Sequence, residues 1–314
     1  MELYNADCIE IMKTIDEKTV DFFVLDLPYA NKKFGKCTAM GWDTPIDLKE
    51  MWAQIKRIMK PTATIVHFCN VKFGFALIES NPKWFKYDLI WKKSKKVGFL
   101  SANKQPLRQH ENMYVFKKEQ GTYNPQKTEG KPYDRGARKG KASIYDTKRT
   151  DGKPNKGDRH PTSIIEHENM YVFKKEQGTY NPQKTNGKPY NKTNTGNNND
   201  DKCAYGKIDR NSHLEGEGNR KINNGDRHPT SIVENTILEH KNPHNTIHRT
   251  QKPVSLLEWL IKTYSNEGDV VMDFCMGSGT AGVACLNTNR HFIGIEKDED
   301  IYNLACNRIE NHKI

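Results

Sequence analysis

A glycine-rich turn near the C-terminal end restricts how this sequence can fold. The segment DFCMGSGTAG, residues 273–282, follows a short apolar run and carries glycines at the spacing GxGxxG. Glycines at this spacing let a ligand approach the backbone closely, as in sheets that bind dinucleotides. Glu296 ends the next apolar run, and the 18 residues after it suffice for one further helix. We therefore expect the other half of the sheet to come from the N-terminal part of the chain.

Strand and helix patterns alternate at both ends of the sequence. The expected strands are 3–4, a run that ends at 26, 63–69, 87–91, 269–274 and 291–296. Six helices are expected between and after them: one that begins near 7, one over 48–59, one that ends at 80, one that begins at 253, one directly after the glycine turn, and one over 298–309. This alternation predicts an α/β fold, a Rossmann-like and mostly parallel sheet with helices on both faces. The two ends of the chain should adjoin at the switch point, where ligands bind in such sheets.

The middle of the chain contains a duplicated segment. HENMYVFKKEQGTYNPQKT occurs at 110–128 and 167–185, and GDRHPTSI occurs at 157–164 and 225–232. Two units are too few for a solenoid, so we interpret them as a segmental duplication. We predict that MYVF of the first copy, residues 113–116, pairs in the sheet, whereas the second copy forms an appendage over residues 167–224. The His110–Glu111 pair is expected to begin a strand rather than to act in catalysis.

Positive charge is concentrated in one segment. The chain has a net charge of +11, and residues 92–160 hold 19 lysines and arginines against 7 acidic residues. Such a surplus favours a polyanion partner, nucleic acid first, because phosphate contacts supply affinity that does not depend on sequence. A solvated lysine-rich loop is the alternative. The candidates for groove contacts in this region are Tyr123, Asn124, Gln126, Arg135 and Arg138.

Several classes of protein are not favoured by the composition. The seven cysteines are scattered singly, without a CxxC pair, which argues against a disulfide framework and a zinc site. The sequence has neither an apolar window of membrane-spanning length nor a signal-peptide pattern at its N-terminus. We expect a soluble, cytoplasmic protein with reduced thiols and no bound metal.

A carboxylate ends one of the buried strands. In DFFVLDLPYA, residues 21–30, an apolar run stops at Asp26 and is followed by Leu27, Pro28 and Tyr29. A buried strand end does not tolerate an unpaired carboxylate, so Asp26 needs a partner or a chemical task. Asp273 places a second carboxylate beside the glycine turn, where it would repel a pyrophosphate but suit a cationic ligand.

These segments together resemble the DNA amino-methyltransferases of the β class. Asp26 to Tyr29 is similar to the DPPY motif of that family, with leucine in place of the first proline, and Asp273 to Thr280 resembles its D-x-F-x-G-S-G-T motif. Thr250 to Pro253 resembles the TQKP motif of the family, and Glu296 resembles the acid of the motif that follows the glycine turn. Asn5 to Cys8 is similar to a turn that lies near the cofactor adenine in relatives. The resemblance covers about residues 1–118 and 225–314.

The resemblance implies a class I methyltransferase fold with S-adenosylmethionine as cofactor. The catalytic domain would comprise 1–118 and 249–314, and a target-recognition region would cover 119–248 with the duplicated units 110–165 and 167–232. The implied catalytic residues are Asp26, Leu27, Pro28 and Tyr29. The implied cofactor-binding residues are Asp7, Thr250, Gln251, Lys252, Pro253, Asp273, Phe274, Gly277, Ser278, Gly279, Thr280 and Glu296.

The expected chemistry is methyl transfer to an exocyclic amine of a base flipped out of double-stranded DNA. The Asp26 carboxylate and the carbonyl of Leu27 or Pro28 would accept the two N–H groups, and the Tyr29 ring would stack on the base. Aspartate at the first motif position favours adenine N6, in a site-specific enzyme of the restriction-modification type that could form a homodimer. The alternatives are cytosine N4 methylation, a catalytically impaired DNA-binding relative, and an NAD-dependent oxidoreductase.

Overall fold

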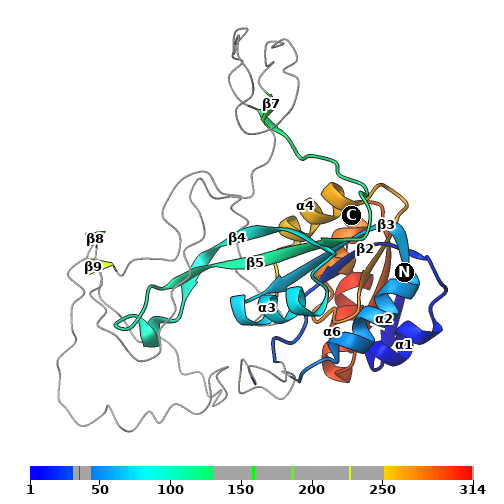
Figure 1. The fold of residues 1–314 in the computed structure, drawn as a ribbon, viewed down its shortest axis with the longest axis horizontal. Helices are drawn as coiled ribbons and strands as arrows, with labels where there is room; N and C mark the ends of the chain where they lie inside the picture. The colour runs from blue at the N-terminus through cyan, green and yellow to red at the C-terminus, as the bar shows by residue number, and fades with distance from the viewer. Residues whose placement is uncertain are drawn as a thin grey trace.

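The structure is a computed structural model that describes residues 1–30, 35, 44–129 and 251–312, together with short strands at 158–159, 185–186 and 226–227. Its centre is a seven-stranded sheet in the order β1-β11-β10-β2-β3-β5-β4 (Figure 1). The strands are β1 (Glu2–Asn5), β2 (Val20–Leu25), β3 (Met59–Cys69), β4 (Phe85–Val97), β5 (Arg108–Lys117), β10 (Val270–Asp273) and β11 (His291–Glu296). β1, β11, β10, β2 and β3 are mutually parallel, whereas β5 runs antiparallel to both β3 and β4.

In the described part of the chain, six α-helices cover the two faces of the sheet. They are α1 (Cys8–Thr14), α2 (Leu48–Ile58), α3 (Val71–Ser80), α4 (Val254–Tyr264), α5 (Thr280–Asn287) and α6 (Glu299–Glu310). Short polar side chains start several of them, because these residues accept hydrogen bonds from unpaired amides of the first turn. Asp7 accepts from Ile9 N, and Asn70 accepts from Phe73 N.

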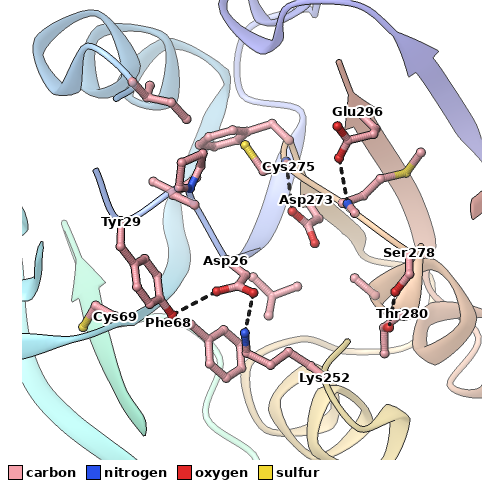
Figure 2. A pocket seen from close by; sticks show the side chains of 18 of the residues that line it. Asp26, Tyr29, Phe68, Cys69, Lys252, Asp273, Cys275, Ser278, Thr280 and Glu296 are labelled. Carbon is pink, nitrogen blue, oxygen red and sulfur yellow. Dashed lines mark hydrogen bonds and ion pairs between the residues drawn. The ribbon is translucent and has the colours of Figure 1, made fainter. Parts of the chain in front are cut away.

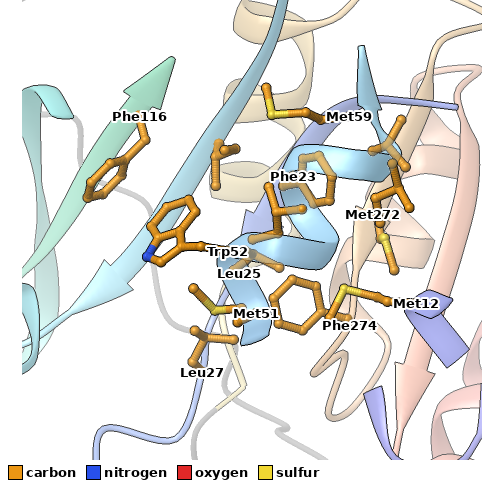
Figure 3. Close-up of a cluster of buried hydrophobic side chains, with 14 of the residues drawn as sticks. Met12, Phe23, Leu25, Leu27, Met51, Trp52, Met59, Phe116, Met272 and Phe274 are labelled. Carbon is orange, nitrogen blue, oxygen red and sulfur yellow. The ribbon is translucent and has the colours of Figure 1, made fainter. Parts of the chain in front are cut away.

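Two buried clusters make up the core, one on each face of the sheet. Phe23 and Leu25 of β2 point to the face covered by α1, α2 and α3, where Trp52 packs beside them (Figure 3). Phe22 and Val24 point to the opposite face, which α4, α5 and α6 cover. The apolar run Phe22–Leu25 within β2 follows from this arrangement, because this part of the strand is buried on both faces and directs no side chain to water.

The expected layout is present, with the N-terminal and C-terminal parts of the chain sharing one sheet. β10 pairs with β2 on one side and with β11 on the other. Connections leave these two central strands in opposite directions, through α2 to β3 and through α5 to β11, so the switch point lies between β10 and β2. No helix in the described part of the chain is both long enough and apolar enough to cross a membrane.

The first duplicated copy supplies a sheet strand, as predicted. Residues 113–116 lie within β5, between β3 and β4. The corresponding residues of the second copy, and most of 167–224, lie outside the described residues. Both copies form the same small antiparallel ladder: β6 (Thr128–Glu129) pairs with β7 (Asp158–Arg159), and β8 (Thr185–Asn186) pairs with β9 (Asp226–Arg227).

Candidate active site

A cavity of about 1240 Å³ opens at the carboxyl ends of the parallel strands. Segments that follow β1, β2, β10 and β11 line it, so residues far apart in the sequence face one another there. Of the residues expected in the site, those lining the cavity are Asp7, Asp26, Leu27, Pro28, Tyr29, Gln251, Lys252, Asp273, Phe274, Gly277, Ser278, Thr280 and Glu296. Thr250 lies outside the described residues.

Asp26 lies directly after β2 and has two partners (Figure 2). The Tyr29 hydroxyl donates to Oδ1 of Asp26 at 3.0 Å, and the Lys252 ammonium forms an ion pair with Oδ2. The Tyr29 ring stacks on Phe73 with centroids 5.5 Å apart. The carboxylate is therefore held at the cavity wall by a neighbour in the turn and by a cation from the C-terminal part of the chain.

Glu111 is a charged residue of the cavity lining whose contacts sequence reasoning missed. It lies in β5 as expected, but its carboxylate is buried and lies within hydrogen-bond distance of the Tyr29 hydroxyl, whose single proton is shared between Glu111 and Asp26. Lys93 Nζ lies 2.7 Å from one oxygen of Glu111, and Lys252 Nζ lies 3.8 Å from the other. Burial acts to raise the pKa of Glu111, but the two ammonium groups outweigh it and bring the pKa to about 2. The available signal was an acid just before an apolar strand segment, the mirror image of the pattern at Asp26, which directly follows one.

Lys252 joins the two carboxylates. It was expected to hold the cofactor, yet its ammonium contacts Asp26 and lies 4.9 Å from the centre of the Phe68 ring. Burial acts to lower the pKa of Lys252, but the charges of Asp26 and Glu111 outweigh it, so the pKa lies above its ordinary value. Lys252 is thus a buried cation paired with Oδ2 of Asp26.

The glycine turn forms the other side of the cavity. Gly277 has φ +51° and its amide donates to Oε2 of Glu296 at 3.0 Å, while Asp298 N donates to Oε1. A Cβ added at Gly277 would meet no atom within 4 Å, so the turn faces open space. The hydroxyl of Thr280 accepts a hydrogen bond from Arg308 of α6 at 3.0 Å.

Asp273 is the most strongly shifted acid of this turn. Its side chain is buried, and Cys275 N donates to Oδ1 at 3.1 Å. Burial raises the pKa of Asp273 to about 8; the nearby charges of Asp26 and Glu296 add to the rise and the Cys275 amide opposes it. A carboxylate whose charge is so poorly compensated suits a cationic ligand.

Two residues that match the glycine and TQKP motifs do not line the cavity. Pro253 is the N-cap of α4 rather than its first residue, and Gly279 has φ +71° at the start of α5. A Cβ at Gly279 would lie 3.1 Å from Ala305 Cβ and 3.0 Å from Ile309 Cδ1. Pro253 thus caps α4 and Gly279 packs closely against α6, while the cofactor contacts expected of both residues stay predictions.

The amides expected to contact a DNA groove are engaged within the protein. The Asn124 side chain donates to the carbonyls of Lys262 and Ser265 at the end of α4, at 3.2 and 3.1 Å. Gln126 donates to the Asn124 carbonyl. The Asn124 amide therefore fixes the segment after β5 to α4, and the groove contact expected of Asn124 stays a prediction. Tyr123 remains 44% exposed, and Arg135 and Arg138 lie outside the described residues.

Metal-binding geometry is not found in the part of the chain that the structure describes, where no group of three or more His, Cys, Asp or Glu side chains could hold an ion.

An open sheet with a glycine turn and a strand-end acid at its switch point defines an α/β protein that binds a nucleotide-like cofactor. A family model described as DNA methylase matches residues 20–307, and the chain belongs to this N6/N4 methylase family. It is 47% identical over 62 residues to the type II methyltransferase M.HindIII of Haemophilus influenzae, covering 20% of each chain. It is 36% identical over 93 residues to M.HpaI of Haemophilus parainfluenzae, covering 29% of this chain and 30% of the relative.

The matches to these curated relatives thus span less than a third of the relatives' length. Among solved structures, the cytosine-N4-specific PvuII DNA methyltransferase superposes with a TM-score of 0.50 at 12% identity, covering 99% of this chain and 87% of that one. At this identity the likeness shows the fold alone, and it confirms the methyltransferase-like α/β architecture expected from the sequence.

Proposed function

We propose that the protein transfers a methyl group from S-adenosylmethionine to the N6 amine of adenine in double-stranded DNA. One observation carries the proposal: Asp26 and the pair Asp273 and Glu296 face the same cavity from opposite sides of the switch point. This reaction needs a carboxylate that accepts hydrogen bonds from the target amine. It also needs an acid-lined glycine turn that binds the positively charged methyl donor. Membership of the DNA methylase family supports the same reaction.

The residues of the turn fit the cofactor chemically. Glu296 is well suited to accept hydrogen bonds from ribose hydroxyls, as acids at this position do in related sheets. Asp273 would pair with a positive group beside the open face of Gly277. The cofactor supplies a methyl group on a positively charged sulfur, so a buried acid next to it gains stabilisation that a neutral ligand would not provide.

Asp26 would act on the target amine. The adenine amine is a weak nucleophile because its lone pair is delocalised into the ring. When the Asp26 carboxylate and a main-chain carbonyl of Leu27 or Pro28 accept its two N–H groups, the nitrogen becomes more pyramidal and its lone pair is exposed. Asp26 then stabilises the positive charge that develops on nitrogen and can accept the proton that is lost.

Lys252 would have to release Asp26 before the base can bind. Its ammonium occupies Oδ2 of Asp26, and Glu111 lies 3.8 Å from the same ammonium. We infer that Lys252 holds the place of the amine in the absence of DNA and shifts towards Glu111 when the base enters. Glu111 would also offset the charge of Lys252, which otherwise opposes a developing cation on the amine.

The proposal is tested by incubating the protein with labelled S-adenosylmethionine and unmethylated plasmid DNA. Nucleoside mass spectrometry then separates N6-methyladenine from N4-methylcytosine, and long-read sequencing gives the modified context. We expect N6-methyladenine in a short sequence, as for a modification enzyme of a restriction system. N4-methylcytosine would correct the base, and unlabelled DNA would refute the reaction.

Asp26→Ala tests the role of the acid. We expect transfer to fall at least tenfold while the protein keeps its fold and its affinity for cofactor, because Asp26 contacts the amine rather than the turn. Asp16→Ala is the matched control, since Asp16 is an exposed acid before the same strand. Activity of Asp26→Ala above a tenth of the wild-type value would contradict the assignment.

A further inference from the structure

The β4–β5 hairpin extends beyond the sheet. β5 pairs with β3 only as far as Asn112, whereas β4 and β5 continue to pair as far as Val97 and Arg108. Residues 92–110 therefore form a two-stranded arm that reaches away from the helices (Figure 1). A short 3-10 turn, Phe99–Ser101, closes the arm after Gly98, whose φ is +87°.

Two large apolar side chains lie exposed at the tip of this arm. Phe99 is 71% exposed and Leu100 is 65% exposed, more than any other large apolar side chain in the described residues. Single exposed apolar residues are common, but two adjacent ones on a projecting turn form a local apolar patch that water does not favour. The patch is thus available to a partner with apolar surface.

The charge of the arm restricts the chemistry of that partner. Residues 92–110 contain five lysines and one arginine and no acidic residue. Two such arms would repel each other, whereas a polyanion would be attracted. Duplex DNA combines a phosphate backbone with apolar base faces that become accessible where a step is unstacked, and proteins commonly insert Phe or Leu at such steps.

The base of the arm borders the candidate active site. Lys93, Val97, Arg108 and His110 line the same cavity as Asp26. Lys93 is also ion-paired with Glu111 at 2.7 Å, which anchors the start of the arm to the site. DNA bound along the arm would therefore lie next to the cavity into which a base must turn.

We propose that the tip of this arm is a wedge for double-stranded DNA. Phe99, with Leu100 beside it, fills the gap in the duplex that is left when the target base enters the cavity, and the exposed Lys96 and Lys104 of the arm bind the adjacent phosphates. The inference rests on the proposed function, since the gap exists only if a base is flipped. Stacking of an aromatic side chain on a neighbouring base offsets part of the cost of unstacking the target.

The double variant Phe99→Ala with Leu100→Ala tests the wedge through its dependence on base pairing. On a duplex with the modified sequence context, we expect the specificity constant kcat/KM for methyl transfer to fall about 10- to 100-fold, because the stacking contact is lost. On the same duplex with the target base mispaired, the fall should stay below about threefold, because a mispaired base leaves the stack at lower cost. Equal losses on both duplexes, or no loss on either, would overturn the wedge.

Phe75→Ala is the matched control, because Phe75 is also a half-exposed phenylalanine but lies on α3. It should leave transfer unchanged on both duplexes. A wild-type protein that transfers no methyl group to any DNA would instead refute the proposed function, so the two failures are distinguishable.

A second experiment does not need turnover. A photo-crosslinking residue, Phe99→p-benzoylphenylalanine, should form adducts with unmethylated plasmid DNA in the full-length protein. The proposal would be overturned if the protein formed no adducts with DNA. It would also be overturned by adducts with a second copy of the chain, or by adducts only with vesicles of anionic phospholipid.

Discussion

Asp273 should make cofactor binding depend on pH. Its pKa of about 8 means that in the free protein about one molecule in ten carries the carboxylate at pH 7. A sulfonium or ammonium group next to this acid stabilises its charged form. Binding of S-adenosylmethionine at pH 7 should therefore release about 0.9 proton, and the affinity should rise about tenfold between pH 7 and pH 9.

The proton release can be measured directly by calorimetry. Titrations of the protein with S-adenosylmethionine at pH 7 in phosphate and in Tris buffer differ in heat by the number of protons released, multiplied by the difference in ionisation enthalpy between the two buffers. Asp273→Asn should abolish the release and the dependence of affinity on pH. Asp269→Asn is a suitable control, because Asp269 lies before the opposite end of β10 and does not line the cavity. Equal heats in both buffers, with binding intact, would refute the reasoning.

The same acid should lower the stability of the free protein at high pH. A carboxyl group whose pKa is higher in the folded state contributes stability that is complete below its unfolded pKa of about 4, and this stability is lost as the pH rises through 8. The difference of about four pKa units corresponds to about 5 kcal/mol. Asp273→Asn should therefore raise the melting temperature more at pH 8.5 than at pH 5, and an equal rise at both values would contradict this.

Two further predictions concern other buried ionisable groups. Glu111→Gln should lower kcat for methyl transfer at least fivefold in the wild type but less than twofold in a Lys252→Met background. The reason is that Glu111 is proposed to act by receiving the Lys252 ammonium, which the second background lacks. Equal effects in both backgrounds would point to a purely structural role. His67 is buried against Trp52 and Phe116, its ring nitrogens have no hydrogen-bond partner among the described residues, and burial lowers its pKa to about 3. The neutral imidazole of His67 contributes stability above pH 6.5 that is lost as the pH falls towards 3. His67→Phe should therefore raise the free energy of unfolding in urea more at pH 4 than at pH 8. An equal change in that free energy at both pH values would refute the assignment.

The sequence was sufficient to predict most elements because their signals are local. Asp7, Asn70 and Asp298 cap the helices that follow them, and the apolar run of β2 is visible in the printed letters. The meeting of Asp26 and Asp273 could also be predicted, since the carboxyl ends of parallel strands lie at one edge of the sheet.

The contacts made by Glu111 and by Gly279 could not be predicted in this way. Glu111 reaches Tyr29 because β5 is antiparallel to β3 in a particular register, and that register depends on packing between distant segments. Gly279 matches the fingerprint, yet it serves close packing because α6 lies against it. A motif gives the spacing of residues but not which of them face the ligand.

The central position of β10 has a consequence for biogenesis. Phe22 of β2 pairs with Val271, so a strand made early acquires this neighbour only after a further 249 residues (271 minus 22) have been translated. At ordinary rates of synthesis the delay is about 12 to 50 s. During that interval the apolar edge of β2 has no partner on this side, and it is open to pairing with other nascent chains. Additional chaperone supply should therefore raise the yield of active protein from recombinant expression, whereas slower translation, which lengthens the interval, should lower it.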